Sequence, residues 1–164
     1  AYYLNLSKAR KSARESDTPF TPAHLLVRGL VKALDILVAD GMETVWKRVA
    51  AMAAATRQAG EAIGLKVFSK SPSDSVTALC PPAGLAVKDI RNELEKRYGI
   101  ESAGGQDQLK GKIVRIAHLG YSDAFDTITA VAALEMALKH FGHPVELGRG
   151  VGAAQAELMS ALPA

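Results

Sequence analysis

The sequence predicts an α+β fold, in which a small antiparallel or mixed sheet carries helices on one face and is preceded by a long helical segment. Two observations support this class. Apolar residues recur at helical spacing from Leu26 to Ile63, and from Leu65 onward the periodicity gives the order strand, strand, helix, strand, strand, helix. With 164 residues, of which 48% are hydrophobic, the chain is long enough for a substantial core.

The first 22 residues are expected to contain little regular structure. Residues 2–6 read as the end of a strand, and residues 7–17 form a polar connector with a basic run that we interpret as solvated. Two prolines then disfavour helix before residue 22. Pro22 itself suits a first helical turn, with Thr21 as its N-cap.

Two helices are expected between residues 22 and 64. The first carries an apolar residue every four positions and stops at Gly41. The second occupies residues 42–63, and its alanines allow close packing against another helix. At about twenty residues it is longer than the average globular helix.

Residues 65–164 contain the expected sheet. Strands are predicted at residues 65–69 and 76–80, joined by a turn, and at residues 100–103 and 112–119. Helices are predicted from Val87 to Gly99, from a cap at Ser122 to Gly142, and over residues 152–162. All of these elements are short enough to form one small domain.

Composition excludes several classes of function. The net charge of +3 and the pI near 9.0 are only mildly basic, and most basic residues alternate with acids, which argues against nucleic acid as a partner. No apolar run is long enough for a membrane span, and no signal peptide is apparent. The single cysteine, Cys80, fits a small buried residue in a reducing compartment, so we expect a cytoplasmic protein. The histidines show no metal-ligand spacing, so no metal is expected.

The predicted strand at residues 112–119 contains a cation, Arg115. Alternation places Arg115 on one face and His118 on the other, and because both faces are apolar we expect both to be covered. A buried guanidinium requires an anion. Its partner is either an internal acid, such as Glu101 or Asp123, or the carboxylate of a small substrate.

The residues around Arg115, and a polar segment elsewhere, add to this picture. Physical considerations alone favour the internal acid, whereas the nearby glycines Gly104, Gly105 and Gly120 would let the backbone approach a ligand. His118 lies on the opposite face and is interpreted as a structural residue. The hydroxyls before the first helix, at Thr18 and Thr21, combine with free amides at its N-terminus into a possible phosphate site.

Three stretches resemble one protein family. They are TPFTPA at residues 18–23, LVKALDILVADGMETVWKR at 30–48 and GGQDQLKGKIVRIAHLGY at 104–121. In this order and spacing they are similar to the C-terminal part of class V, fold type I aminotransferases that depend on pyridoxal 5′-phosphate. The branch is that of the serine–pyruvate, alanine–glyoxylate and archaeal-type aspartate aminotransferases.

The resemblance implies a homodimeric enzyme that moves an amino group between a small amino acid (alanine, serine or aspartate) and a 2-oxo acid (glyoxylate or pyruvate). By the same resemblance, Arg115 binds the substrate carboxylate, and Thr21 and Thr18 contact the cofactor phosphate of the neighbouring subunit. Residues 1–22 correspond to the end of the large domain and a connector, residues 23–64 to linking helices, and residues 65–164 to the small domain.

No lysine of this chain matches the family's Schiff-base lysine. The resemblance therefore places the catalytic lysine upstream of residue 1, and we expect no catalytic residue in this chain and no activity from it alone. The alternative is a non-catalytic binding or assembly module. In that module Arg115 would be paired internally, and the long helix at residues 42–63 would offer the contact surface.

Overall fold

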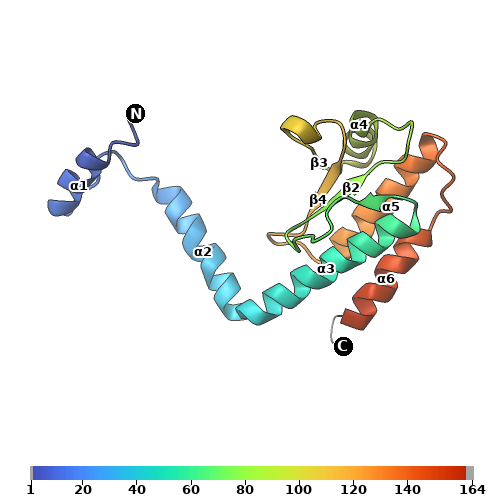
Figure 1. The fold of residues 1–164 in the computed structure, drawn as a ribbon. Coiled ribbons are helices and arrows are strands. Elements are labelled where there is room, and N and C mark those ends of the chain that lie inside the picture. Colours follow the sequence, from blue (N-terminus) through green and yellow to red (C-terminus); the bar gives the residue numbers. More distant parts are fainter. Residues whose placement is uncertain (1, 162–164) are drawn as a thin grey trace. The chain divides into compact units, whose positions relative to one another are not determined.

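A computed structural model describes residues 2–161 of the chain. It divides into two compact units, residues 1–42 (unit 1) and residues 43–164 (unit 2), which are described separately below. Unit 1 is helical, whereas unit 2 combines four strands with helices. The predicted α+β class and the antiparallel form of its sheet are thus confirmed (Figure 1).

Unit 1 begins with helix α1 (Leu6–Arg14), where the sequence suggested a strand end and a connector. That prediction is wrong because Asn5 is an N-cap: its side chain accepts a hydrogen bond from the backbone N–H of Lys8 at 3.0 Å. Aromatic packing joins the start of the unit to the loop after α1. The ring of Phe20 lies 4.9 Å from that of Tyr2 and 4.8 Å from that of Tyr3.

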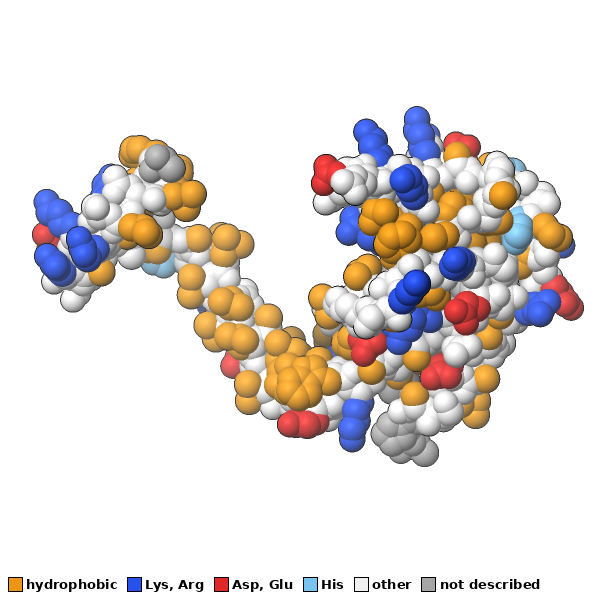
Figure 2. Space-filling model, in the orientation of Figure 1, with side chains coloured by type: hydrophobic (Ala, Val, Ile, Leu, Met, Phe, Trp, Pro, Cys, Tyr) orange, Lys and Arg blue, Asp and Glu red, His pale blue; other side chains and the backbone are white. Residues whose placement is uncertain are grey.

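Helix α2 (His24–Asp40) follows this loop. Its N-cap is Ala23, whose side chain makes no capping hydrogen bond. The prediction of Thr21 as N-cap is therefore wrong, because the helix begins at His24, two residues after Pro22. Gly41 ends the helix as predicted, with a positive φ of 79° that favours glycine. No residue of α2 is buried, and apolar side chains cover it (Figure 2).

Unit 2 contains a four-stranded antiparallel sheet in the order β1-β2-β4-β3. The strands are β1 (Lys66–Val67), β2 (Val76–Cys80), β3 (Ala103–Gly104) and β4 (Val114–Ala117). Strand β2 has its predicted bounds. The other three are shorter than, or displaced from, their predictions, because the ladder of backbone hydrogen bonds ends before the apolar pattern does.

The long helices of unit 2 match the predicted ones closely. They are α3 (Met42–Ala62), α4 (Val87–Tyr98), α5 (Ala124–His140) and α6 (Arg149–Ala161), with a 3-10 turn, η1 (Asp107–Leu109), before β4. One cap differs from its prediction. Asp123, rather than Ser122, caps α5, since its carboxylate accepts from the N–H groups of Phe125 and Asp126 and the Asp126 side chain accepts in return from the N–H of Asp123.

The core of unit 2 lies on one face of the sheet. Leu79 of β2 and Val114 of β4 are paired in register, are at most 3% exposed, and pack with residues of α4 and α5 such as Leu94 and Leu138. Helix α3 approaches so closely that a Cβ on Gly60 would lie 2.7 Å from Leu79 Cδ2. A second cluster joins α3, α5 and α6. Helices therefore cover one face, as predicted (Figure 1).

A buried carboxylate fixes the start of α6. Glu135 of α5 is 2% exposed and accepts hydrogen bonds from the backbone N–H groups of Gly148, Gly150 and Val151. These amides begin a helix, so the carboxylate replaces the water that they would otherwise need. Because this contact is made between distant parts of the chain, the local sequence pattern does not indicate it.

Candidate functional site

Arg115 lies in the middle of β4, on the face of the sheet opposite the core. Its neighbours across the ladder are two small residues, Ala78 of β2 and Ala103 of β3. The side chain is half-buried, and its Nε–H donates to the carbonyl of Gly104 at 2.8 Å. This hydrogen bond holds one edge of the guanidinium against β3.

The expectation that both faces of this strand are covered is wrong. Ala117 and Leu119 share the face of Arg115, and both are exposed, Leu119 to 60%. The physical reason is the arrangement of the helices, which pack on the other face only. Apolar residues on this side therefore form an open floor around the guanidinium instead of a second core.

Neither acid suggested as an internal partner pairs with Arg115. Within residues 2–161, Arg115 makes no ion pair with a carboxylate, and Asp123 is instead engaged in capping α5. Glu101 stands nearer, in the same surface hollow. The residues that line this hollow are Val76, Glu101, Ser102, Ala103, Arg115 and Ala117. The guanidinium thus faces an open hollow with small walls, and its terminal nitrogens are available to an external anion.

The glycine pair before β4 serves the fold of its own loop. A Cβ on Gly105 would lie 1.9 Å from the carbonyl oxygen of Leu109, so only glycine fits there. A Cβ on Gly104 would lie 3.3 Å from a terminal nitrogen of Arg91, whose Nε–H donates to the carbonyl of Ser102 at 2.9 Å. These glycines allow close approach of the chain to itself, and thereby fix the carbonyl that Arg115 binds.

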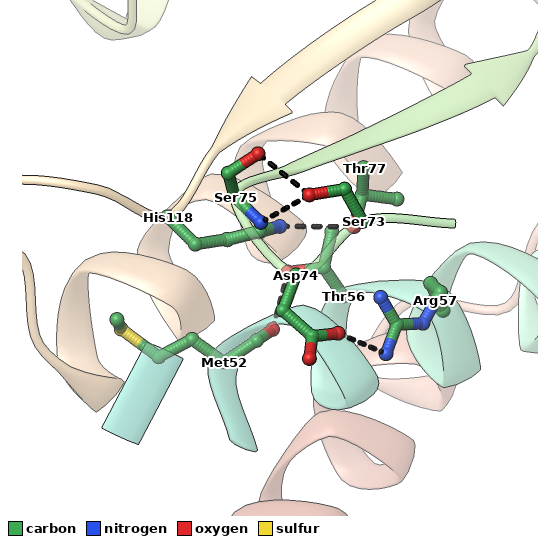
Figure 3. A network of polar contacts seen from close by, with 8 residues as sticks. All are labelled: Met52, Thr56, Arg57, Ser73, Asp74, Ser75, Thr77 and His118. Carbon is green, nitrogen blue, oxygen red and sulfur yellow. Dashed lines mark hydrogen bonds and ion pairs between the residues drawn. The ribbon is translucent and has the colours of Figure 1, made fainter. Parts of the chain in front are cut away.

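His118 occupies the inner face of the same strand, as predicted from alternation. It is 2% exposed, its Nε2 lies 2.9 Å from the hydroxyl of Thr77, and its backbone N–H donates to the carbonyl of Ser75 (Figure 3). The pKa of His118 is lowered to about 4, first by burial and then by the positive charge of Arg57, while the negative charge of Asp74 acts in the opposite direction. The ring is therefore neutral at physiological pH and joins β4 to β2.

A polar network surrounds this histidine and was not predicted (Figure 3). Arg57 of α3 pairs with Asp74 in the turn before β2 at 3.0 Å, and the hydroxyls of Ser73 and Ser75 lie 2.8 Å apart in that turn. Pairs such as Thr77 and His118 are 41 residues apart in sequence. The turn residues were recognised as turn chemistry, but their partners are set by the fold.

Thr18 and Thr21 belong to unit 1, whereas Arg115 and His118 belong to unit 2. Both threonines are exposed. The hydroxyl of Thr18 donates to the carbonyl of Phe20 at 2.7 Å, while that of Thr21 makes no side-chain hydrogen bond within the described part of the chain. Of the two, Thr21 therefore has its hydroxyl hydrogen available to a ligand.

Metal sites and membrane spans are two other features that the described residues could have carried. Residues 2–161 contain no group of three or more His, Cys, Asp or Glu side chains placed to hold a metal ion. In the same range, none of the helices combines the length and the apolar character that crossing a membrane requires.

No family model matches the chain, but comparisons with known proteins find relatives among hydrogenase subunits and aminotransferases. The chain is 40% identical over 163 residues to the small subunit of a soluble hydrogenase from Synechococcus, covering 98% of this chain and 42% of that protein. It is 40% identical over 139 residues to serine–glyoxylate aminotransferase from Hyphomicrobium methylovorum, covering 83% of this chain and 34% of the enzyme. The chain thus spans less than half the length of these relatives.

The solved structures similar to this chain include several aminotransferases. Pyridoxamine–pyruvate aminotransferase from Mesorhizobium loti superposes with a TM-score of 0.83 at 34% identity, covering 88% of this chain and 38% of the enzyme. Aminotransferases therefore recur among the sequence relatives and the structural neighbours alike. The aminotransferases among these homologues and neighbours are of class V, and the chain is similar to the C-terminal part of such enzymes.

Proposed function

We propose that this chain is the C-terminal part of a pyridoxal phosphate-dependent aminotransferase. The enzyme would move an amino group between a small amino acid (alanine, serine or aspartate) and a 2-oxo acid such as glyoxylate or pyruvate. The observation that carries the proposal is Arg115, a guanidinium on the open face of the sheet that forms no ion pair within residues 2–161. The names of the relatives, which include serine–glyoxylate and pyridoxamine–pyruvate aminotransferases, support the reaction type.

Arg115 would bind the α-carboxylate of the substrate. A guanidinium offers two parallel N–H donors that match the two oxygens of a carboxylate, and this fixes orientation as well as position. The Nε–H bond to Gly104 restrains the guanidinium before the substrate arrives. Binding in one orientation places the substrate α-carbon for proton removal, so Arg115 contributes through positioning.

The hydroxyls of unit 1 fit a role in holding the cofactor phosphate. Thr21 is exposed and can donate to a phosphate oxygen, whereas Thr18 already donates to Phe20 and can only take part after it rotates. In the homodimer implied by the family resemblance, these contacts would be made to the neighbouring subunit. When bound, pyridoxal phosphate supplies the electron sink that stabilises negative charge at the substrate α-carbon.

The same proposal covers the domain boundaries and the Schiff-base lysine, which no lysine of this chain matches. Residues 1–22 would end the large domain, residues 23–64 would link it to the small domain, and residues 65–164 would form that small domain. The lysine that binds the cofactor would lie upstream, so this chain alone should be inactive. Mass spectrometry of the source protein should then detect a polypeptide more than twice as long as this chain, in proportion to the relatives.

Replacement of Arg115 tests the proposal in the full-length polypeptide. In Arg115→Ala, kcat/KM for amino-acid substrates should fall by about 100-fold, because a charge-assisted pair with the carboxylate is lost. The absorbance of the bound cofactor should not change. The control is Arg97→Ala, which removes an exposed guanidinium paired with Glu93 on α4 and should leave turnover as it was.

The results separate the alternatives. Unchanged turnover in Arg115→Ala would refute the carboxylate role. A full-length protein that turns over no amino acid would favour the binding or assembly module. Because the Synechococcus relative is described as a hydrogenase subunit, hydrogen uptake by the same preparation should be measured beside transamination. Uptake without transamination would contradict the proposed reaction.

A further inference from the structure

We infer that Glu101 selects against substrates with a second carboxylate. This inference rests on the proposed function and deepens it: of the amino donors named above, it favours alanine and serine over aspartate. The residue that would exclude the dicarboxylate lies in this chain, beside Arg115, and not in the part of the enzyme upstream of it.

The ladder between β3 and β4 gives the position of Glu101. Ala103 pairs with Arg115 in antiparallel register, so side chains two residues apart lie on the same face. Continued by two residues, this register sets Glu101 opposite Ala117, on the face that carries Arg115. In a paired ladder such diagonal neighbours lie roughly 7–8 Å apart. Here the pairing ends at Ala103, and the hollow that both side chains line shows that Glu101 and Arg115 are neighbours.

Among residues 2–161, Glu101 and Arg115 are the only charged residues that line the hollow; its other walls are Val76, Ser102, Ala103 and Ala117. Within the described range Glu101 forms no ion pair with Arg115 or any other cation, so its charge is not cancelled by a contact there. It stands beside the anion site without occupying it.

This arrangement discriminates between substrates by charge. The α-carboxylate of any amino acid would be bound by Arg115 and would neutralise it. The second carboxylate of aspartate would then meet Glu101 with no further cation on the walls of the hollow. A methyl or hydroxymethyl side chain has no such charge. Because Glu101 is exposed, water and salt screen the repulsion, and its effect on selectivity should be several-fold and not absolute.

The experiment measures kcat/KM for aspartate and for alanine with the full-length enzyme and its Glu101→Gln variant. The variant keeps the shape of the side chain and removes its charge. The ratio of aspartate to alanine should rise by about five-fold, and the rise should shrink at high salt. Glu95→Gln is the matched control, because Glu95 is exposed on α4 and does not line the hollow.

The outcomes are distinct. An unchanged ratio in Glu101→Gln, or an equal change in Glu95→Gln, would overturn the inference while leaving the aminotransferase intact. Loss of turnover for alanine and aspartate alike in Glu101→Gln would also overturn it, since that would make Glu101 part of the general binding machinery. A parent enzyme without transamination of any amino acid would instead refute the proposed function, and the inference with it.

Discussion

Helices α2 and α5 have the same length and the same number of apolar residues, yet their surroundings differ completely. Each has 17 residues, of which 11 are alanine, valine, leucine, isoleucine, methionine or phenylalanine. Helix α5 buries seven residues in unit 2, whereas α2 buries none in unit 1. Apolar composition therefore makes a helix suitable for burial, but neighbouring elements decide whether it is buried.

The polar residues of α2 sharpen this contrast. Arg28, Lys32 and Asp35 follow one another along a single narrow stripe, and most of the remaining circumference is apolar. Helices that are apolar nearly all round are typical of protein interiors. Helix α2 thus leaves an extensive apolar surface exposed, and apolar side chains are visible along it in Figure 2.

The largest expected difference comes from the same substitution in each helix. Leu138→Ala in α5 should lower the free energy of unfolding by about 3 kcal/mol, because Leu138 is 0% exposed and its loss leaves a cavity. Leu30→Ala in α2, where Leu30 is 58% exposed, should change it by less than about 0.5 kcal/mol. Urea denaturation of the 164-residue chain measures both. An equally large loss in Leu30→Ala would show that α2 is covered in solution.

A second effect concerns the buried polar groups of unit 2. The pKa of His118 is about 4 in the folded chain and near 6.5 when unfolded, so the unfolded chain binds the extra proton between these values. The contribution of His118 to the free energy of unfolding is therefore fully present above pH 6.5 and is lost as the pH falls toward 4. By pH 5 the loss should be about 2 kcal/mol.

Comparison with His118→Gln isolates this contribution, because other carboxylates also titrate in acid. The wild-type chain should lose about 2 kcal/mol more than the variant between pH 7 and pH 5. Parallel pH profiles for the two proteins would mean that His118 is not held in its neutral form by the fold.

The smallest expected change in the free energy of unfolding comes from replacing two glycines of α6. A Cβ on Gly150 would lie 2.8 Å from Ile63 Cγ2 and 2.9 Å from Glu135 Oε1, so Gly150→Ala should cost about 1–2 kcal/mol. Gly152 has no atom within 4 Å of such a Cβ, and Gly152→Ala should stabilise the helix by up to about 1 kcal/mol. Thermal unfolding of both variants should shift in opposite directions. Shifts of the same sign would contradict the close packing at Gly150.

Much of unit 2 was predictable because its signals are local. The periodicity of β2 and of α4, and the glycine that ends α4 in a left-handed conformation, lie within a few residues of each other. Helix α1 was missed because a single capping residue, Asn5, outweighs an otherwise polar pattern. The Arg115 site was predictable in part: alternation separates Arg115 from His118, but it cannot show which face remains open.

By itself, the sequence determined the order of strands and helices from Leu65 onward, the opposite placement of Arg115 and His118, and the likeness to class V aminotransferases. These depend on residues close together in the chain or on motifs read in order. Tertiary structure alone decided that the face of Arg115 is open, that Glu101 stands beside it, and that Glu135 caps a distant helix. These contacts are between residues that lie far apart in the sequence and that packing brings together, so no local pattern of side chains predicts them.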